Sequence, residues 1–568
     1  MKLVQSALAR WPDYARLEQA VEGGAVPGAV TGLSGVHKCC VIASLCKKTG
    51  RRALVLAADE AEAQRFCEDL AALGLRPVSY PLRDFNFRDT AGTSHEYERL
   101  RLEALSKLED GQCDCIVACM DAALQYTLGP EELERKLFTL RPGDQLEIAD
   151  LLEALVKCGY TREDQIEGPG QFSHRGGIVD FFSPSANAPV RVEFWGDEVD
   201  SLSSFDMESQ RRTESIPQVT LAPCVEVIPE KPAFLAQKIE KLAASLRGKN
   251  APKAKEVLRG EAEKLKNGLR IGSMDKFISL VYPQAATLFD YFPPEDSLLF
   301  FSEGNKLKER VRTTLWQWGE DVKSYLAEGL LCKGLDQYSQ DWEYALGKAE
   351  ETPALFLDLF ARGSYEIPTK TLVNMTAKQL SPWGGGVELL AEDLRALLDQ
   401  GRACAVLAGA ERAGKALAED LKRAGLPAAW MDAASTVNPG TVVVTLGALS
   451  AGFELPEANF ALITHGRMTE VKRKRVKRDK NSKEISSLSE LAPGDYVVHA
   501  THGIGLFEGI HKLEMNGVTK DYIKVRYAKN DTLYVPVTQL DLVSKYIGPR
   551  EDSAVKLSRL GGADWQRQ

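Results

Sequence analysis

The fold is decided by the stretch TGLSGVHKCCVIASL, residues 31–45, which has the spacing of a phosphate-binding loop followed by a helix. Such a loop reads G-x-x-x-x-G-K-[ST], and its backbone N–H groups cradle phosphates in front of a helix. Gly32 and Lys38 stand at the required spacing, but His37 replaces the second glycine and Cys39 replaces the Ser or Thr. The stretch therefore predicts a nucleotide-binding type of α/β fold whose loop has lost working parts.

These replacements remove the chemistry of the loop. A glycine before the lysine lets the backbone close around a phosphate, whereas a histidine restricts it. A cysteine thiol is a poor ligand for Mg²⁺. The stretch LFFSEGN at 299–305 matches the second half of such a site, which would read D-E-x-H at its end. We expect a degenerate, non-functional nucleotide site without catalytic residues, made of Gly32, Gly35, His37, Lys38, Cys39, Ser302 and Glu303. An ATP-dependent helicase acting alone is the alternative from another class.

Length, charge and cysteine content limit the possible classes of protein. The chain has 568 residues, enough for about three to five domains. Its formal net charge of −9 argues against a purely electrostatic nucleic-acid coat. The 11 cysteines form no C-x-x-C pair, so they predict reduced thiols in a cytoplasm rather than a zinc ribbon or a disulfide framework. The N-terminus predicts a short amphipathic helix, and no apolar run reaches the ~18–20 residues of a membrane span.

Hydrophobic patterning divides the chain. RALVLAA at 52–58 and CIVACM at 115–120 predict buried strands of a parallel sheet, and a second α/β pattern follows SPWGGG at 381–386. HRGGIVDFF and VRVEFWGDEV predict a β-rich insert, and the last strands predict a small antiparallel barrel. The predicted parts are 1–127 and 214–365 for a split α/β domain, 128–213 for the insert, 366–466 for a small α/β domain, 467–488 for a basic linker, 489–550 for the barrel and 551–568 for a connection.

Several stretches resemble known families. YPLRDFNFRDTAGTSHEYERLRLEALS at 80–106, TLFDYFPPEDSLLFFSE at 287–303 and RGGIVDFF resemble the nucleotide-excision-repair helicase UvrB. GDYVVHATHGIG, followed by DTLYVPVTQLDLVSKYIG, resembles the RNA-polymerase-interacting module of CarD-type regulators and transcription-repair coupling factors. The chain is thereby identified as a member of the bacterial transcription-repair coupling factor (Mfd) family. The resemblance covers nearly the whole chain and is weakest in 340–470, where GALSAGFELP carries it.

The resemblance implies both architecture and function. It makes 1–127, 128–213 and 214–365 UvrB-like domains 1a, 2 and 1b, and 489–550 a CarD/Tudor-like barrel. It implies an adaptor that binds the β subunit of stalled RNA polymerase and recruits UvrA for DNA repair. The family's motor, an ATP- and Mg-dependent double-stranded DNA translocase of helicase superfamily 2, would follow residue 568, so this chain is expected to be no enzyme and to hold no cofactor. A CarD-type regulator without a repair role is the alternative.

The resemblance assigns UvrA binding to Arg175, Arg191 and Trp195, where the family commonly has Phe at the position of Trp195. Strand periodicity places Arg191, Glu193 and Trp195 on one face of a strand. Two arginines and an aromatic ring supply forked donors and rigid apolar area, as interface hot spots do. The alternative is an ordinary solvated strand on which Arg191 pairs with Glu193 or Asp197.

The resemblance assigns polymerase binding to Lys512, Leu513 and Glu514. Their segment, IHKLEMNGVTKDYIKV, is suited to an edge strand that adds its backbone to a sheet of the partner. We expect Leu513 to be an exposed apolar anchor, because an Asn516–Gly517 turn so close behind favours a hairpin tip. A core leucine is the alternative.

Two further features have competing interpretations. His499, His502 and His511 suggest a metal, but strand spacing separates the first two, so we expect structural histidines and no metal. Residues 467–483 carry nine Lys or Arg. They predict a flexible linker, with weak contact to DNA phosphates as the alternative.

Overall fold

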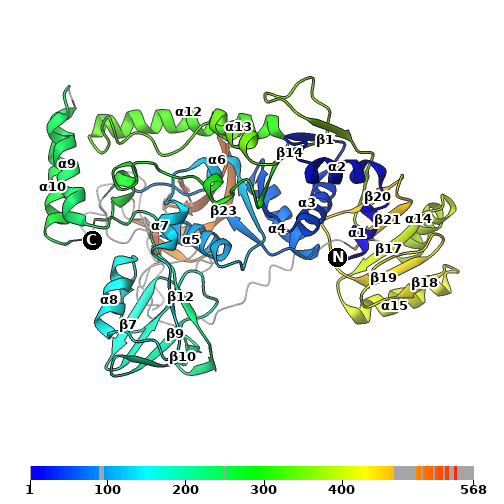
Figure 1. The fold of residues 1–568 in the computed structure, drawn as a ribbon, viewed down its shortest axis with the longest axis horizontal. Coiled ribbons are helices and arrows are strands. Elements are labelled where there is room, and N and C mark those ends of the chain that lie inside the picture. The colour runs from blue at the N-terminus through cyan, green and yellow to red at the C-terminus, as the bar shows by residue number, and fades with distance from the viewer. Residues whose placement is uncertain are drawn as a thin grey trace.

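A seven-stranded parallel sheet forms the centre of the molecule, in the order β15–β1–β14–β13–β2–β4–β3 (Figure 1). The computed structural model describes residues 2–88, 95–248, 250–269, 271–384, 386–465, 494–499, 503–515, 518–528, 531–536 and 543–545. The strands are β1 (Gly28–Thr31), β2 (Arg52–Ala57), β3 (Pro77–Tyr80), β4 (Cys115–Cys119), β13 (Ser297–Ser302), β14 (Ala354–Asp358) and β15 (Thr371–Asn374).

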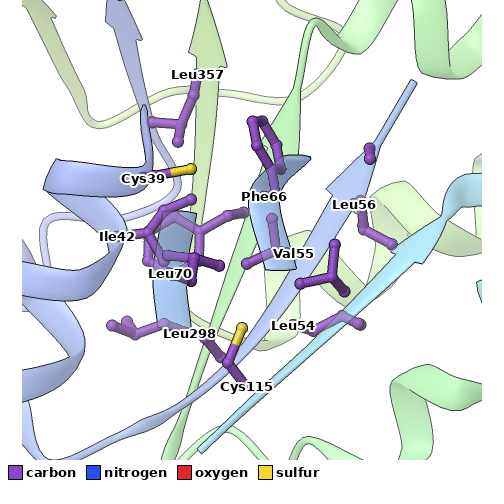
Figure 2. Packing of buried hydrophobic residues seen from close by; sticks show 14 of the residues in the cluster. Cys39, Ile42, Leu54, Val55, Leu56, Phe66, Leu70, Cys115, Leu298 and Leu357 are labelled. Carbon is purple, nitrogen blue, oxygen red and sulfur yellow. The ribbon is translucent and has the colours of Figure 1, made fainter. Parts of the chain in front are cut away.

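Helices cover this sheet, which is why its central strands are almost continuously apolar. Figure 2 shows Cys39 and Ile42 of one helix and Phe66 and Leu70 of the next packed on the side chains of β2. The predicted strands at 52–58 and 115–120 are confirmed as the neighbours β2 and β4. The helices of this domain are α1 (Lys2–Leu8), α2 (Pro12–Glu22), α3 (Gly35–Thr49), α4 (Glu60–Ala72), α5 (Glu96–Glu109), α6 (Met120–Leu124), α12 (Gly304–Glu328) and α13 (Trp342–Glu351).

The predicted β-rich insert lies between β4 and β13. Its six-stranded sheet has the order β11–β10–β9–β8–β7–β6, and its apolar face packs against α8 (Ile148–Lys157). The boundary predicted at residue 213 falls before β12, which pairs with β5 at the root of the insert. The strands are β5 (Phe138–Leu140), β6 (Thr161–Arg162), β7 (Gln171–Arg175), β8 (Ile178–Phe181), β9 (Val190–Trp195), β10 (Glu198–Phe205), β11 (Arg212–Ser215) and β12 (Val219–Leu221).

A helical hairpin follows the insert and projects at one end of the molecule (Figure 1). It consists of α9 (Pro232–Ser245) and α10 (Ala251–Lys266), as the Lys/Glu-rich sequence at 231–270 predicts. The two helices share a core of their own that includes Ile239 and Leu258.

The small α/β domain has a six-stranded sheet in the order β16–β20–β21–β17–β19–β18. It packs directly on the first domain: the backbone N–H and the hydroxyl of Ser450 both donate to the carboxylate of Asp69 in α4, at 2.8 and 2.5 Å. Its elements are β16 (Lys378–Leu380), α14 (Val387–Asp399), β17 (Ala403–Ala408), α15 (Glu411–Arg423), β18 (Ala428–Trp430), β19 (Val442–Leu446), β20 (Gly452–Leu455) and β21 (Phe460–Thr464).

The C-terminal strands form an antiparallel five-stranded sheet in the order β25–β24–β23–β22–β26, and its closure into a barrel stays a prediction. The predicted linker 467–488 and the segment 551–568 lie outside the described residues. No helix of the described ranges is long and apolar enough to cross a membrane. The strands are β22 (Tyr496–His499), β23 (Gly503–Met515), β24 (Val518–Arg526), β25 (Thr532–Pro536) and β26 (Val543–Lys545).

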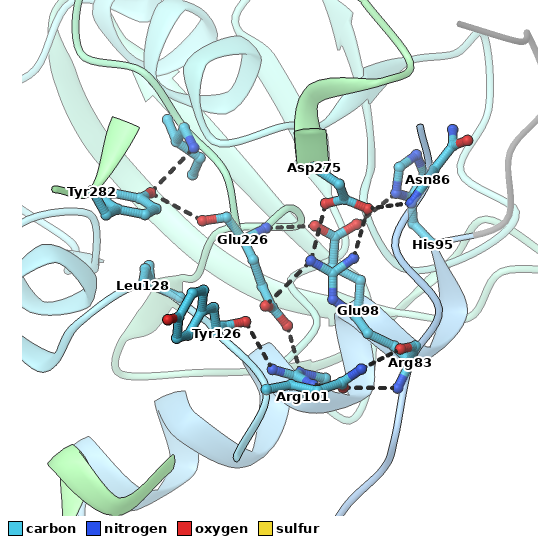
Figure 3. A network of polar contacts seen from close by, with 12 residues as sticks. Arg83, Asn86, His95, Glu98, Arg101, Tyr126, Leu128, Glu226, Asp275 and Tyr282 are labelled. Carbon is cyan, nitrogen blue, oxygen red and sulfur yellow. Dashed lines mark hydrogen bonds and ion pairs between the residues drawn. The ribbon is translucent and has the colours of Figure 1, made fainter. Parts of the chain in front are cut away.

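A buried network of charges joins the insert to the central domain (Figure 3). Glu226, where the chain returns from the insert, forms an ion pair with Arg101 of α5 at 2.7 Å and lies 3.4 Å from Arg83. Arg83 also donates two hydrogen bonds of 2.9 Å to Asp275. The backbone N–H of Glu226 donates to Glu98 at 2.6 Å. Four segments that are distant in sequence are therefore tied together at the root of the insert.

Removing Arg101 tests how much this junction contributes. Arg101 and Glu226 are both 0% exposed, and burial raises the pKa of the Glu226 carboxyl against the charges of Arg101 and Arg83. We expect Arg101→Met to lower the free energy of unfolding by about 3–5 kcal/mol, because a buried carboxylate loses its partner. The measurement is urea unfolding followed by circular dichroism.

The matched control is Arg76→Met, which breaks an exposed pair with Asp114. Exposed pairs contribute little, so this variant should unfold like the wild type. Equal behaviour of the two variants would show that the buried network does not stabilise the fold.

Candidate nucleotide and protein-interaction sites

The loop between β1 and α3 is occupied by its own side chains. His37 caps α3: the backbone N–H of Ser34 donates to His37 Nδ1 at 3.3 Å, and the Ser34 hydroxyl lies 2.8 Å from the same atom. The ring packs edge-on against Phe453 of the small α/β domain, with centroids 5.6 Å apart. Burial lowers the pKa of the His37 imidazole to about 4, so the ring is neutral at pH 7. The residue that replaces the loop glycine thus serves helix capping and domain packing.

Lys38, the lysine of the former phosphate site, is neutralised within the protein. Its side chain is 2% exposed, and its ammonium donates to Glu303 Oε1 at 2.6 Å and to Ser302 Oγ at 3.0 Å. Ser302 in turn donates to a carboxylate oxygen of Glu62 at 2.9 Å. The two halves of the degenerate motif therefore contact each other at the carboxyl ends of β1 and β13, which are separated in the sheet by β14.

Gly32 is held against the chain that enters the small domain. Its φ is +87°, and a Cβ added there would lie 2.0 Å from the carbonyl oxygen of Met375. The N–H of Met375 donates to Thr31 O at 2.9 Å, and the N–H of Gly32 donates to Leu359 O at 3.1 Å. Sequence reasoning missed this contact, because nothing local to 366–375 indicates that the segment returns to the loop.

The three residues predicted for UvrA binding lie on one face of the insert's sheet. Arg175 pairs with Ile178, which pairs with Glu193, and directly paired residues point to the same side. Arg191 and Trp195 lie two residues to either side of Glu193 and so share its face. The opposite face, with Val190 and Val192, packs into the core of the insert.

The three side chains differ in availability. Trp195 is 83% exposed. Arg175 is exposed and donates to the backbone carbonyl of Asp164. Arg191 is only 18% exposed, because it donates two hydrogen bonds of 2.8 Å to Asp180 of β8 and its guanidinium lies 4.9 Å from the ring centroid of Phe205.

The alternative partners considered for Arg191 from the sequence were wrong. Glu193 pairs with Arg212 instead, and the partner of Arg191 is Asp180, which faces it across two adjacent strands. The single acidic residue in the apolar strand IVDF was the available signal. Asp180 holds the pKa of the Arg191 guanidinium above its usual range through their hydrogen bonds. Arg191 thus braces the sheet that presents Trp195.

Lys512, Leu513 and Glu514 lie on β23, in register with Asp521, Lys520 and Thr519 of β24. β22 pairs with β23 only at residues 503–506, so the half of β23 from Ile510 to Met515 has one unpaired edge among the described strands. Side chains 512–514 and the Asn516–Gly517 turn lie outside the description, so the exposure of Leu513 stays a prediction.

The histidines of this sheet do not form a described metal centre. His499 lies on β22 and His511 on β23, whereas His502 is outside the described residues. Within the described part of the chain, no group of three His, Cys, Asp or Glu side chains is arranged to hold a metal ion.

Two protein families match these regions. Residues 138–226 match the UvrB interaction domain, and residues 491–547 match the CarD-like/TRCF RID domain. The chain is 31% identical to the transcription-repair-coupling factor of Bacillus subtilis (strain 168) over 580 residues, which cover 100% of this chain and 49% of that protein. It is 26% identical to the factor of Staphylococcus aureus (strain MRSA252) over 556 residues, 95% of this chain and 46% of that protein.

The chain thus joins an α/β domain with an altered phosphate-loop motif to two regions that match interaction-domain families. The chain is similar to transcription-repair-coupling factors, in agreement with the resemblance seen in its sequence. It spans about half the length of the curated relatives it matches.

Lys38 gives a test of the loop's present role. We expect Lys38→Ala to lower the free energy of unfolding by about 1–3 kcal/mol, because Glu303 and Ser302 lose their buried partner. Saturating MgATP should leave the melting temperature of the wild type unchanged, since a ligand that binds the folded state would raise it. The measurement is a thermal melt with and without nucleotide.

Lys306→Ala on α12 is the control, because this lysine is exposed beside the same site. A nucleotide-dependent rise in melting temperature that Lys38→Ala abolishes would mean that the loop still binds ATP.

Proposed function

We propose that this chain is the adaptor part of a transcription-repair-coupling factor. It binds the β subunit of stalled RNA polymerase through 489–550 and recruits UvrA through the insert. The observation that carries the proposal is the presence of a UvrB interaction domain and a CarD-like/TRCF RID domain in one chain. The first of these matches disfavours a CarD-type regulator without a repair role.

The adaptor itself has no ATPase activity and needs no cofactor in this proposal. Support comes from the contacts of Lys38, whose ammonium is held by Glu303 and Ser302, and from Gly32, which is pressed against Met375. In this proposal, ATP-driven translocation on double-stranded DNA belongs to the family's motor domains and not to residues 1–568. We place the protein in the bacterial cytoplasm, in keeping with its 11 cysteines, which are all free.

The UvrA contact is centred on Trp195 and Arg175. Trp195 has a large exposed ring on β9, a strand that is held to its neighbour β8. Rigid aromatic residues of this kind are enriched in interface hot spots. Arg191 contributes by holding this strand to β8 through Asp180. The two kinds of role predict different consequences for binding and for stability.

We expect Trp195→Ala to weaken UvrA binding by about 1–3 kcal/mol without changing the melting temperature. Arg175→Ala should weaken binding in the same way, because its side chain is exposed. Arg191→Ala should lower both affinity and melting temperature, since it leaves Asp180 without its bidentate partner. The measurements are titration calorimetry with UvrA and thermal melts.

Phe138→Ala, an exposed aromatic at the root of the same insert, is the control for loss of apolar surface. Unchanged affinity in the Trp195→Ala, Arg175→Ala double variant would exclude this face as the UvrA site.

Polymerase binding uses the unpaired edge of β23 in this proposal. Backbone groups from Ile510 to Met515 extend a partner sheet, and Leu513 fills an apolar site beside them. The finer expectation, a closed CarD/Tudor-like barrel, is part of the proposal and fits the match of residues 491–547.

We expect Leu513→Arg to abolish binding of the polymerase β subunit, because the partner would close over an unpaired charge. The control is Tyr534→Arg on β25, an exposed residue at the opposite edge of the same sheet. Binding is measured by pull-down beside a thermal melt of each variant. Normal melting with normal binding would remove Leu513 from the interface, and unfolding of the sheet would identify it as a core residue.

A further inference from the structure

The helical hairpin of α9 and α10 lies in a segment of the sequence with an excess of cations. Residues 231–270 contain eleven Lys or Arg and four Glu, in a chain whose formal net charge is −9. Neither of the proposed partner contacts uses this segment.

The hairpin exposes its charges because each helix buries only one face. Ile239 and Ala243 of α9 pack with Leu258 and Ala262 of α10 in a separate small core. The hairpin lies at one end of the molecule, so the other faces of the two helices are open to solvent (Figure 1). A helix of 16 residues such as α10 is about 24 Å long.

One ion pair fixes which flanks of the helices lie side by side. Glu240 of α9 contacts Lys266 of α10 at 2.6 Å. Residues seven or eleven positions apart share a helix face. Lys255 and Arg259 therefore lie on the same flank of α10 as Lys266, whereas Arg247 lies beyond the end of α9, at the tip of the hairpin. Lys255 and Arg259 lead along this flank from the Glu240–Lys266 pair towards the tip, and together with Arg247 at the tip they are called the stripe.

Arg247 and Arg259 are exposed, and Lys255 is half-buried. Among the described residues, no side chain forms an ion pair or hydrogen bond with Lys255 or Arg259, nor with Lys253 and Lys241 on other faces. Arg247 donates to the backbone carbonyls of Ala244 and Leu246, which leaves its charge without a carboxylate partner.

We propose that this stripe of Arg247, Lys255 and Arg259 binds the phosphate backbone of duplex DNA. The exposed residues around it include the small or polar Ala244, Ser245, Asn250 and Gly260 and the two carboxylates Glu256 and Glu263. Phosphate binding requires cations and no apolar centre, whereas protein interfaces are built around buried aromatic or aliphatic anchors. The exposed hydrophobic residues of the hairpin, Phe234 and Leu269, lie at its opposite end. The stripe therefore favours a nucleic acid over an acidic protein surface.

The test uses the full 568-residue chain and a fluorescent 20-base-pair duplex, with binding measured by anisotropy across a range of salt concentrations. We expect Lys255→Glu/Arg259→Glu to weaken duplex binding at low salt at least about fivefold. The slope of log affinity against log salt should fall by about two, one for each lost phosphate contact.

The matched control is Arg412→Glu/Lys415→Glu on α15, which changes net charge equally at the opposite end of the molecule (Figure 1). This variant should retain the affinity and salt slope of the wild type. It also separates the hairpin from the basic run 467–483, whose contribution is the same in all variants.

Three results would overturn the proposal. The hairpin variant could bind duplex like the wild type, or both variants could weaken equally, in which case only net charge matters. Labelled polyglutamate of matched charge could bind more tightly than the duplex in a hairpin-dependent manner, which would assign the stripe to an acidic protein. If the double Glu variant melts early, Lys255→Gln/Arg259→Gln serves the same comparison. UvrA and polymerase binding are unaffected by these changes, so the outcome is separate from the proposed function.

Discussion

The ion pair between Lys38 and Glu303 is the contact on which the central domain depends. A lysine ammonium that is removed from water must find a partner, because burial of an unpaired charge is costly. In a nucleotide-binding loop the partner is a phosphate, and in this chain it is the acidic residue at the end of β13. The parallel sheet allows Glu303 to take the place of a phosphate, because the carboxyl end of β13 lies close to the start of α3.

The neutralised loop becomes a surface on which another domain packs. The ring of His37 packs edge-on against Phe453, and the missing side chain of Gly32 leaves room for the backbone of Met375. Asp69 of α4 receives two hydrogen bonds from Ser450. The small α/β domain thus occupies the region that a nucleotide would approach, and the two α/β parts share one hydrophobic core. This accounts physically for a retained loop frame without its chemistry: the frame positions a domain interface.

Periodicity and burial allowed much of the fold to be predicted. The continuous apolar run of the strand CIVAC is typical of a parallel sheet that helices cover on both faces. The apolar residues of the α3 helix fit the same arrangement. Contacts between residues far apart in the sequence could not be predicted, because they depend on the strand register and on where the chain returns to the same place in the fold. Arg191 shows the difference: its face followed from spacing, but its partner Asp180 required the β8–β9 register. The Arg101–Glu226 pair joins residues 125 positions apart, and no local pattern links them.

The parts of the molecule that are held by buried charge pairs differ from its exposed surfaces. The insert is anchored by buried charge pairs that have few alternative arrangements, since each loses its partner if the geometry changes. This anchoring fixes the direction in which β9 presents Trp195. The residues proposed as contacts, such as Trp195, can then be exposed without weakening the fold. The proposed adaptor would benefit from this arrangement, because a preorganised surface loses less conformational entropy on binding than a mobile one. Under that proposal, the network at the root of the insert bears on affinity for a partner that it does not touch.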